Sequence, residues 1–320
     1  MDISVIICTW NNSKRLAITL EAISQCIIPK ELNWEIVIVN NNCTDDTDKI
    51  IRALAEKLPF VYVKELQQGL SRARNKGLEV AKGKLIIFTD DDVKPCQEWL
   101  SSYWAAYQEK PEGFFFGGPV ESEFEISNFD RDLLLLAPSS VKGLSWENNP
   151  RILNKDEYFI GANWACPSYA LKDSGSFDIN KGLNASPKII IIGEEADLMD
   201  RLKELGLTPW YLPTAKLLHF VPKYKLNLKH ISARWESEGY TIARENMVNF
   251  QLHLIFGIPR WMFRRIFVLW KKWILTKLIG KKAYREYRRF RGMIGIMKAT
   301  RENYLQIIFD KSKNKLLKNY

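Results

Sequence analysis

The chain opens with Ile3-Ser4-Val5-Ile6-Ile7-Cys8-Thr9-Trp10-Asn11-Asn12, an apolar and β-branched run that ends in polar residues. Similar runs follow at residues 35–39, 60–63 and 85–88. Short apolar runs of this kind are typical of strands that are buried on both faces. The first 90 residues therefore predict four strands.

Amphipathic helical patterns separate these runs. The clearest place apolar groups on one face of a helix, at Leu16, Leu20, Ile23 and Ile27, and again at Ile50, Ile51, Leu54 and Leu58. A third helix is predicted over residues 71–82, with Gly83 as its end. Strands and helices that alternate at this spacing predict a doubly wound α/β fold with a mainly parallel sheet. Ligands bind beyond the carboxyl ends of the strands in such sheets.

The pattern is weaker in the middle of the chain, where short strands are expected at residues 158–164 and 167–171. A helix is predicted over residues 194–205. Its expected buried stripe and its end are Leu198, Leu202, Leu205 and Gly206.

Charge divides the chain into two parts. The net charge is +10, yet residues 221–320 hold 23 Lys and Arg against 6 Asp and Glu, and the first 220 residues hold 24 against 31. A basic surface attracts phosphate-rich partners, whereas the acidic part must act through local sites. We therefore expect a catalytic domain over residues 1–221 and a basic, aromatic helical region over residues 222–320.

The five cysteines show no CxxC spacing, and the N-terminus lacks the basic start and long apolar stretch of a signal peptide. A reducing compartment fits this pattern, so a cytoplasmic location is expected, peripheral on the inner face of the cell membrane. Residues 258–280 alternate apolar groups with Arg and Lys, which predicts a segment that lies on an anionic membrane without crossing it.

Three tryptophans, Trp261, Trp270 and Trp273, are expected near the lipid headgroups. The alternative is a helical lid that packs on the catalytic domain and keeps a solvated basic face. No nucleic-acid partner is expected, because the sequence has no RNA-binding signature such as RNP1.

Three consecutive carboxylates, Asp90, Asp91 and Asp92, follow the fourth predicted strand. Like charges at this distance repel unless a cation or water compensates them. In an extended turn Asp90 and Asp92 point the same way, and carboxylate oxygens suit Mg²⁺ or Mn²⁺ with a bridging phosphate. The alternative is an acidic cap for a helix near Glu98, in which Asp91 or Asp92 accepts backbone N–H bonds.

The run at residues 39–47 is dense in side chains that both donate and accept hydrogen bonds, as recognition of a nucleotide base requires. We expect Asn40 and Asn41 to face the ligand, and residues 44–46 to begin a helix. Since neither a P-loop nor a GxGxxG fingerprint is present, a metal is expected to handle the phosphates.

Acidic residues also begin the predicted helix at residue 194. Glu194, Glu195 and Asp197 are stabilised there by the helix dipole, and a carboxylate at this place can also act as a general base on a hydroxyl. His219 follows a last strand expected at residues 213–218. It is either a hydrogen-bonded structural group or a ligand for Mn²⁺.

Five motifs in this order resemble those of the family 2 glycosyltransferases of the GT-A fold, from Ile3 to about Val221. They lie at residues 4–12, 39–47, 69–77, 88–92 and 193–198. The resemblance implies donor contacts from Thr9, Trp10, Asn11, Asn40, Asn41, Gly69, Ser71, Arg72, Asn75, Asp90 and Asp91. It also implies a sugar or acceptor pocket lined by Gly161, Ala162 and Asn163, and a metal site formed by Asp90, Asp92 and His219.

By the same match the catalytic base is Glu195, which is one methylene longer than the usual aspartate and leaves room for Glu194 or Asp197 to share the role. The resemblance implies a metal-dependent, inverting transfer from a nucleotide-sugar donor to a hydroxyl of a glycan or lipid-linked acceptor, in polysaccharide or glycoconjugate biosynthesis. A UDP-sugar is expected, although Asn40 stands where many members have aspartate and leaves guanosine and deoxythymidine open. The alternatives are a nucleotidyltransferase acting on a sugar phosphate and a non-catalytic protein that binds membranes or nucleic acid.

Overall fold

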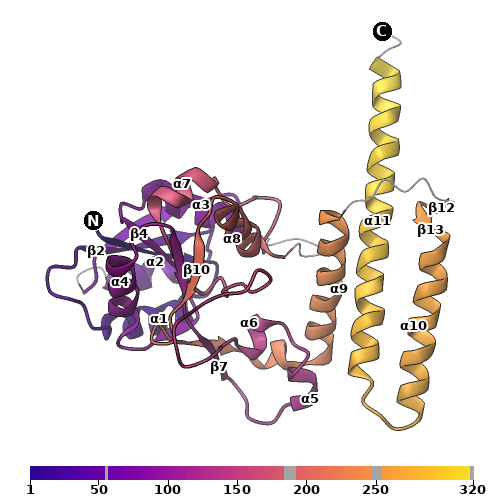
Figure 1. Cartoon of the computed structure of the whole chain (residues 1–320), viewed down its shortest axis with the longest axis horizontal. Helices are drawn as coiled ribbons and strands as arrows, with labels where there is room; N and C mark the ends of the chain where they lie inside the picture. Colours follow the sequence, from indigo (N-terminus) through magenta and orange to yellow (C-terminus); the bar gives the residue numbers. More distant parts are fainter. Residues whose placement is uncertain (55–56, 184–191, 247–253, 318–320) are drawn as a thin grey trace. The chain divides into compact units, whose positions relative to one another are not determined.

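An eight-stranded sheet forms the centre of the first part of the chain in the computed structural model, which describes residues 1–54, 57–183, 192–246 and 254–317 (Figure 1). The strand order is β3-β2-β1-β4-β9-β6-β10-β8. The bounds are β1 (Ile3–Thr9), β2 (Trp34–Asn40), β3 (Phe60–Lys64), β4 (Leu85–Asp90), β6 (Phe114–Gly117), β8 (Arg151–Ile152), β9 (Asn163–Pro167) and β10 (Thr208–Tyr211). The four strands predicted in the first 90 residues are confirmed.

The sheet has a parallel half and a mixed half. β1 pairs in parallel with β2 and β4, and β3 pairs in parallel with β2. β9 runs antiparallel to both β4 and β6. The chain builds β2 and β3 on one side of β1 before it returns to β4 on the other side, and such a reversal of strand order is where open α/β sheets bind ligands.

Helices cover both faces of this sheet, and the alternation of side chains along β1 explains why. Val5 and Ile7 pack in one apolar cluster with residues of three helices, α1 (Ser13–Ser24), α2 (Thr47–Leu54) and α4 (Trp99–Glu109). Ile6 points to the opposite face and packs in a cluster with α3 (Leu70–Val80), α7 (Ser168–Ser174) and α8 (Glu194–Glu204). Because side chains alternate along a strand, a run that is apolar at every position has to be covered on both sides.

The expected strand at residues 167–171 is wrong. β9 ends at Pro167, and the residues that follow form α7. A short apolar run fits a strand and a buried helix equally well. Here the helix buries Ala170 and Leu171 against the sheet.

Apolar positions expected on the buried faces of two helices lie beyond the ends of those helices, although the expected end of α8 at Gly206, with φ 88°, is confirmed. α1 ends at Ser24 and α8 at Glu204, so Ile27 and Leu205 lie outside the helices and are half exposed. α3 ends at Val80, before Gly83. Gly83 is required for close packing, since a Cβ there would lie 2.3 Å from the backbone nitrogen of Ser4.

A second sheet of three strands places His219 close to the end of β4. Its order is β5-β11-β7, with β5 (Val93–Pro95), β7 (Val120–Phe124) and β11 (Leu217–Val221). His219 lies within β11 and pairs with Val93 in antiparallel register. The strand expected before His219 therefore begins later and contains it.

The described residues divide into two compact units. The first contains Met1–Ser127, residues 139–183 and Gly193–Pro222; the second contains Asn128–Pro138, Ile192 and the described residues from Lys223 onward. The remaining helices and strands are α5 (Arg131–Leu134), α6 (Ser139–Lys142), η1 (Lys223–Leu226), α9 (Leu228–Glu245), β12 (Leu254–Ile255), β13 (Ile258–Pro259), α10 (Arg260–Leu278) and α11 (Tyr284–Leu317). Among the described helices, none combines the length and apolar character needed to cross a membrane.

Candidate active site

Two carboxylates and one imidazole converge at the carboxyl end of β4. Ligand atoms of Asp90, Asp92 and His219 all lie within 4.8 Å of one another. His219 Nε2 lies 3.3 Å from Asp92 Oδ1, and the histidine is buried. Two carboxylates with one imidazole form a donor set that suits Mn²⁺.

The alternative of an acidic helix cap is wrong for these aspartates. β5 separates the aspartates from α4, which begins only at Trp99. Asp91 Oδ1 instead accepts a hydrogen bond of 2.7 Å from the side-chain amide of Asn12, which lies in the loop after β1 and directly precedes α1. The turn therefore directs its carboxylates across the sheet edge, toward the first strand and toward β11.

The charge at this edge is costly without a cation. Burial and repulsion from Asp92 raise the pKa of Asp91 to about 7. Burial also raises the pKa of Asp90, although Arg74 opposes the rise, with Nη2 3.8 Å from Asp90 Oδ1. A divalent cation would relieve both desolvation and repulsion, because it supplies the missing positive charge.

A second acidic group lies at the beginning of α8, where Arg74 holds two glutamates together. Arg74 Nη1 donates to Glu194 Oε1 over 2.9 Å and to Glu195 Oε1 over 3.0 Å. The arginine is buried and stacks on the ring of Phe177, with Cζ 5.3 Å from the ring centroid. Sequence reasoning missed Arg74, although its three-residue spacing from Ser71 and from Gly77 would have placed it on the buried face of α3.

The three candidate bases differ in their surroundings. Burial and the neighbouring Glu195 raise the pKa of Glu194 to about 8. Burial opposes ionisation of Glu195, but Arg74 and a hydrogen bond from Glu194 hold its pKa below the usual value. Asp197 is paired with Lys181 (2.8 Å) and Arg201 (3.0 Å). Of these two glutamates, Glu195 is thus the ionised one, and at 21% exposure its side chain is more accessible than that of Glu194, at 6%.

Gly161 and Ala162 lie where the two acidic groups meet. A Cβ on Gly161 would lie only 2.0 Å from Glu195 Oε1, so the carboxylate rests directly against the glycine backbone. The carbonyl of Ala162 accepts a hydrogen bond of 2.8 Å from Thr89, the residue before Asp90. This segment therefore ties β4 to the glutamate.

Asn163 does not line a pocket, contrary to expectation. Its Oδ1 accepts from Trp99 Nε1 (2.8 Å) and the Tyr103 hydroxyl (2.9 Å), and its Nδ2 donates to the carbonyls of Pro119 and Ala215. All four bonds are formed inside the protein, and the residue is fully buried. It joins β9 to α4 and to the loops that lead to the smaller sheet.

Asn40 and Asn41 were expected to face the ligand, but their side-chain amides are hydrogen-bonded to other groups of the protein. Asn40 donates to Asp48 and Tyr62 and accepts from the backbone of Cys43. Asn41 donates to the carbonyls of Glu65 and Gln67 and accepts from the backbone N–H of Gly69. Both are buried, so they shape the loops beside the site instead of offering free polar atoms.

The other residues expected to contact the donor from the loops after β1 and β2 lie at the same sheet edge. Thr9 is buried at the end of β1, whereas Trp10 is 48% exposed. Asn11 adopts a left-handed conformation (φ 50°), and its Oδ1 accepts from the backbone of Thr44 over 2.7 Å. Asn11 thereby joins the loops after β1 and β2.

Four further residues were expected to contact the donor from the beginning of α3. Two of them, Ser71 and Asn75, attach this helix to residues 177–181. The Ser71 hydroxyl donates to the carbonyl of Lys181 over 2.7 Å. Asn75 donates to the carbonyl of Phe177 and accepts from its N–H. Gly69 precedes the helix with φ 143°, and Arg72 is half-buried. Among these four, Arg72 is the residue whose cationic side chain remains partly accessible.

A family model and several relatives match this chain. The model of the family described as Glycosyl transferase family 2 matches residues 4–177. A chondroitin synthase of Pasteurella multocida is 27% identical over 54% of this chain and 18% of its own length. Glycosyltransferase AglE of Haloferax volcanii is 32% identical over 31% of this chain and 33% of its own, and succinoglycan biosynthesis protein ExoM of Rhizobium meliloti is 21% identical over 76% and 75%. The matched part thus spans a third or less of the first two relatives.

Solved structures share the fold at low sequence identity. Residues 1–349 of Staphylococcus aureus TarS, in complex with UDP-GlcNAc, align with a TM-score of 0.54 at 16% identity, covering 96% of this chain and 92% of that one. The mannosyltransferase PcManGT of Pyrobaculum calidifontis, in complex with GDP-Man and Mn²⁺, aligns with a TM-score of 0.51 at 15% identity, covering 99% and 80%.

Proposed function

From the premise that the chain belongs to glycosyl transferase family 2, and is a glycosyltransferase of GT-A fold, we propose that it moves a sugar from a nucleotide-sugar donor to a hydroxyl group by a metal-dependent, inverting displacement. The observation that carries this proposal is the placement of two different acidic groups at one sheet edge. Asp90, Asp92 and His219 form a cluster that fits a divalent cation, and Glu195 forms an ionised carboxylate beside Gly161.

Asp90, Asp92 and His219 would hold the metal in this proposal. When bound, Mn²⁺ or Mg²⁺ supplies positive charge that stabilises the diphosphate of the departing nucleotide. Arg74 lies between the two acidic groups, within 3.8 Å of Asp90 and 3.0 Å of Glu195. Its charge keeps Glu195 ionised while the fold holds the carboxylates near one another.

Glu195 is the residue we assign as general base. A base must be unprotonated before the reaction and accessible to the acceptor hydroxyl. Glu194 is more deeply buried and its pKa is raised, and Asp197 is neutralised by Lys181 and Arg201. Asp197 is ionised and partly exposed as well, but only Glu195 combines the ionised form and partial exposure with a position against Gly161, beside the aspartate cluster.

The donor we propose is a nucleoside diphosphate sugar, with a UDP-sugar as the first choice. The ligands named with two of the structural neighbours, UDP-GlcNAc and GDP-Man with Mn²⁺, belong to this chemical class. A glycan or lipid-linked hydroxyl is the acceptor class that we propose, in polysaccharide or glycoconjugate synthesis, as the names of the relatives chondroitin synthase and succinoglycan biosynthesis protein support.

Product analysis tests the proposed reaction. The protein is incubated with UDP-, GDP- and dTDP-sugars, with and without Mn²⁺, and the released nucleotide is identified. We expect one nucleoside diphosphate to be released, with water or an added glycan as acceptor, only when metal is present. Release of pyrophosphate from a nucleoside triphosphate and a sugar phosphate would instead establish the rival nucleotidyltransferase activity.

Gly161→Ala is expected to lower kcat by about 100-fold, because the added methyl group would displace the Glu195 carboxylate that now lies 2.0 Å from that position. Steady-state release of nucleoside diphosphate measures the loss. Gly292→Ala is the matched control, since its Cβ would meet only one backbone atom, at 3.8 Å. Equal activity of Gly161→Ala and wild type would show that the position of Glu195 does not limit turnover.

A further inference from the structure

Within the described residues of the second unit, α10 packs against another helix on one side only. α11 lies between α9 and α10 (Figure 1). Its contact with α9 is close, because a Cβ on Gly239 would lie 2.1 Å from the Gly292 carbonyl oxygen. Ion pairs cross the same contact, with Arg288 3.0 Å from Glu238, and Arg291 and Lys298 on Glu236. α9 and α11 therefore neutralise much of each other's charge.

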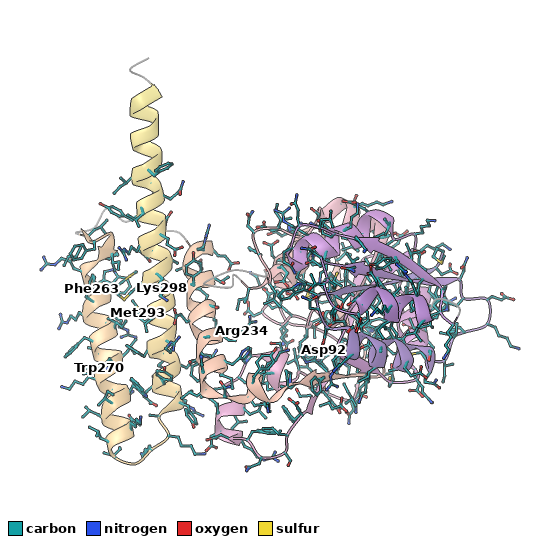
Figure 2. The ribbon with its side chains drawn as sticks, turned by 180° about the vertical axis from the view of Figure 1, so that it is seen from behind. Asp92, Arg234, Phe263, Trp270, Met293 and Lys298 are labelled. Carbon is teal, nitrogen blue, oxygen red and sulfur yellow. The ribbon has the colours of Figure 1, made fainter. Side chains whose placement is uncertain are left out.

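The inner side of α10 packs on α11 through apolar and aromatic groups. Met262 is buried in a cluster with Ile258 and Met293, and Figure 2 shows Met293 between the two helices. Trp273 stacks on Tyr287, with ring centroids 4.5 Å apart. This contact fixes which side of α10 faces α11.

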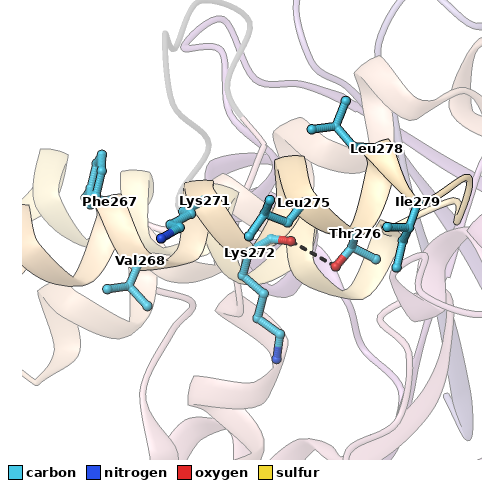
Figure 3. Close-up of a pocket in the computed structure, with 8 residues that line it drawn as sticks. All are labelled: Phe267, Val268, Lys271, Lys272, Leu275, Thr276, Leu278 and Ile279. Carbon is cyan, nitrogen blue, oxygen red and sulfur yellow. Dashed lines mark hydrogen bonds between the residues drawn. The ribbon is translucent and has the colours of Figure 1, made fainter.

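The opposite side of α10 alternates basic and apolar residues. We call it the outer face; it consists of Arg264, Phe267, Val268, Lys271, Leu275 and Leu278. Spacing of three and four residues places these groups on one side of a helix. The apolar members are 59%, 50%, 51% and 76% exposed, in the order Phe267, Val268, Leu275, Leu278. Figure 3 shows these four with Lys271 around a surface pocket.

The charge of α10 is of one sign. Its basic residues are Arg260, Arg264, Arg265, Lys271, Lys272 and Lys277, and it holds no acidic residue. Within the part of the chain that the structure describes, none of these six forms an ion pair, in contrast to the paired arginines of α11. The outer face thus offers unpaired positive charge beside exposed apolar groups.

We propose that the outer face of α10 binds the surface of a bilayer that contains anionic lipids. Phe267, Val268, Leu275 and Leu278 would enter the boundary between headgroups and acyl chains, where burial of apolar area stabilises the bound state. Arg264 and Lys271 have long aliphatic stems that let their charged ends reach the lipid phosphates from the same face.

Two other occupants fit this surface less well. A second copy of the same face would bring Arg264 and Lys271 against their own counterparts, and like charges across an interface repel. A nucleic acid would match the charge but would leave Phe267 and Leu278 without an apolar partner, since its backbone is a hydrated polyanion.

The experiment is flotation of the full chain with vesicles of phosphatidylcholine alone and of phosphatidylcholine with phosphatidylglycerol. We expect binding that requires the anionic lipid and weakens with salt. Removing Arg264 and Lys271 of the outer face together with Lys272, which lines the pocket on that side of α10, as R264Q/K271Q/K272Q, is expected to lower the affinity by about 100-fold, at about fivefold for each charge. The apolar variant F267S/L275S is expected to reduce binding as well.

Matched controls separate the outer face from overall charge and apolar content. K30Q/K57Q/K172Q removes the same charge from exposed positions in the first unit, and L66S removes an exposed leucine there; both should bind as wild type does. Equal binding by the outer-face and control variants would overturn the proposal, as would absence of flotation with anionic vesicles. A dimer in sedimentation that the apolar variant dissociates would assign the face to a second copy instead.

Discussion

Glu195→Gln is expected to lower kcat by about 10²–10⁴-fold while the affinity for the donor stays unchanged. The amide has nearly the shape of the carboxylate but cannot accept the proton of the attacking hydroxyl. Glu195 is the ionised member of the pair that Arg74 holds, so its loss removes the base without leaving a cavity. Single-turnover kinetics measure the chemical step, and donor binding is measured by calorimetry.

Glu194→Gln is the matched control for this variant. The raised pKa of Glu194 favours its protonated form near neutral pH, and glutamine imitates that form. We therefore expect the control to keep most of its turnover. If Glu194→Gln were the more damaging change, the base would be Glu194 and the assignment within the pair would be reversed.

Asp92→Asn is expected to lower kcat by about 10²–10³-fold at saturating donor and to weaken Mn²⁺ binding. Asp92 contributes one carboxylate of the cluster with Asp90 and His219, and its charge is part of what attracts a cation there. Release of nucleoside diphosphate over a Mn²⁺ titration reports the loss of turnover. Electron paramagnetic resonance of free Mn²⁺ reports binding independently of catalysis.

The neighbouring Asp91→Asn provides the metal-binding control. Asp91 lies in the same turn, but its carboxylate accepts from Asn12 and lies outside the cluster of three. We expect this variant to bind Mn²⁺ as wild type does. Loss of Mn²⁺ binding in Asp91→Asn with retention in Asp92→Asn would show that the turn presents a different carboxylate to the metal.

The parallel half of the sheet could be predicted from the sequence, because the residue patterns that indicate its strands and helices are local. An uninterrupted apolar run such as residues 5–8 can be satisfied only by burial on both faces, and the intervening helices follow from their spacing. The sequence was not sufficient for residues 167–171, where the run is too short to distinguish a strand from α7. Tertiary packing made that choice.

The α/β class, the aspartate turn after β4 and the acidic beginning of α8 could all be predicted from the amino-acid sequence, since each depends on residue type and spacing along a short segment. The contacts that those segments make with one another could not be predicted in the same way and are seen only in the folded protein. The tertiary structure placed the amides of Asn40, Asn41 and Asn163 inside the protein, and it brought Arg74 from α3 to the two glutamates, 120 and 121 residues away. A polar side chain looks the same in sequence whether it meets ligand or protein, and its partners are set by contacts between segments that are distant along the chain.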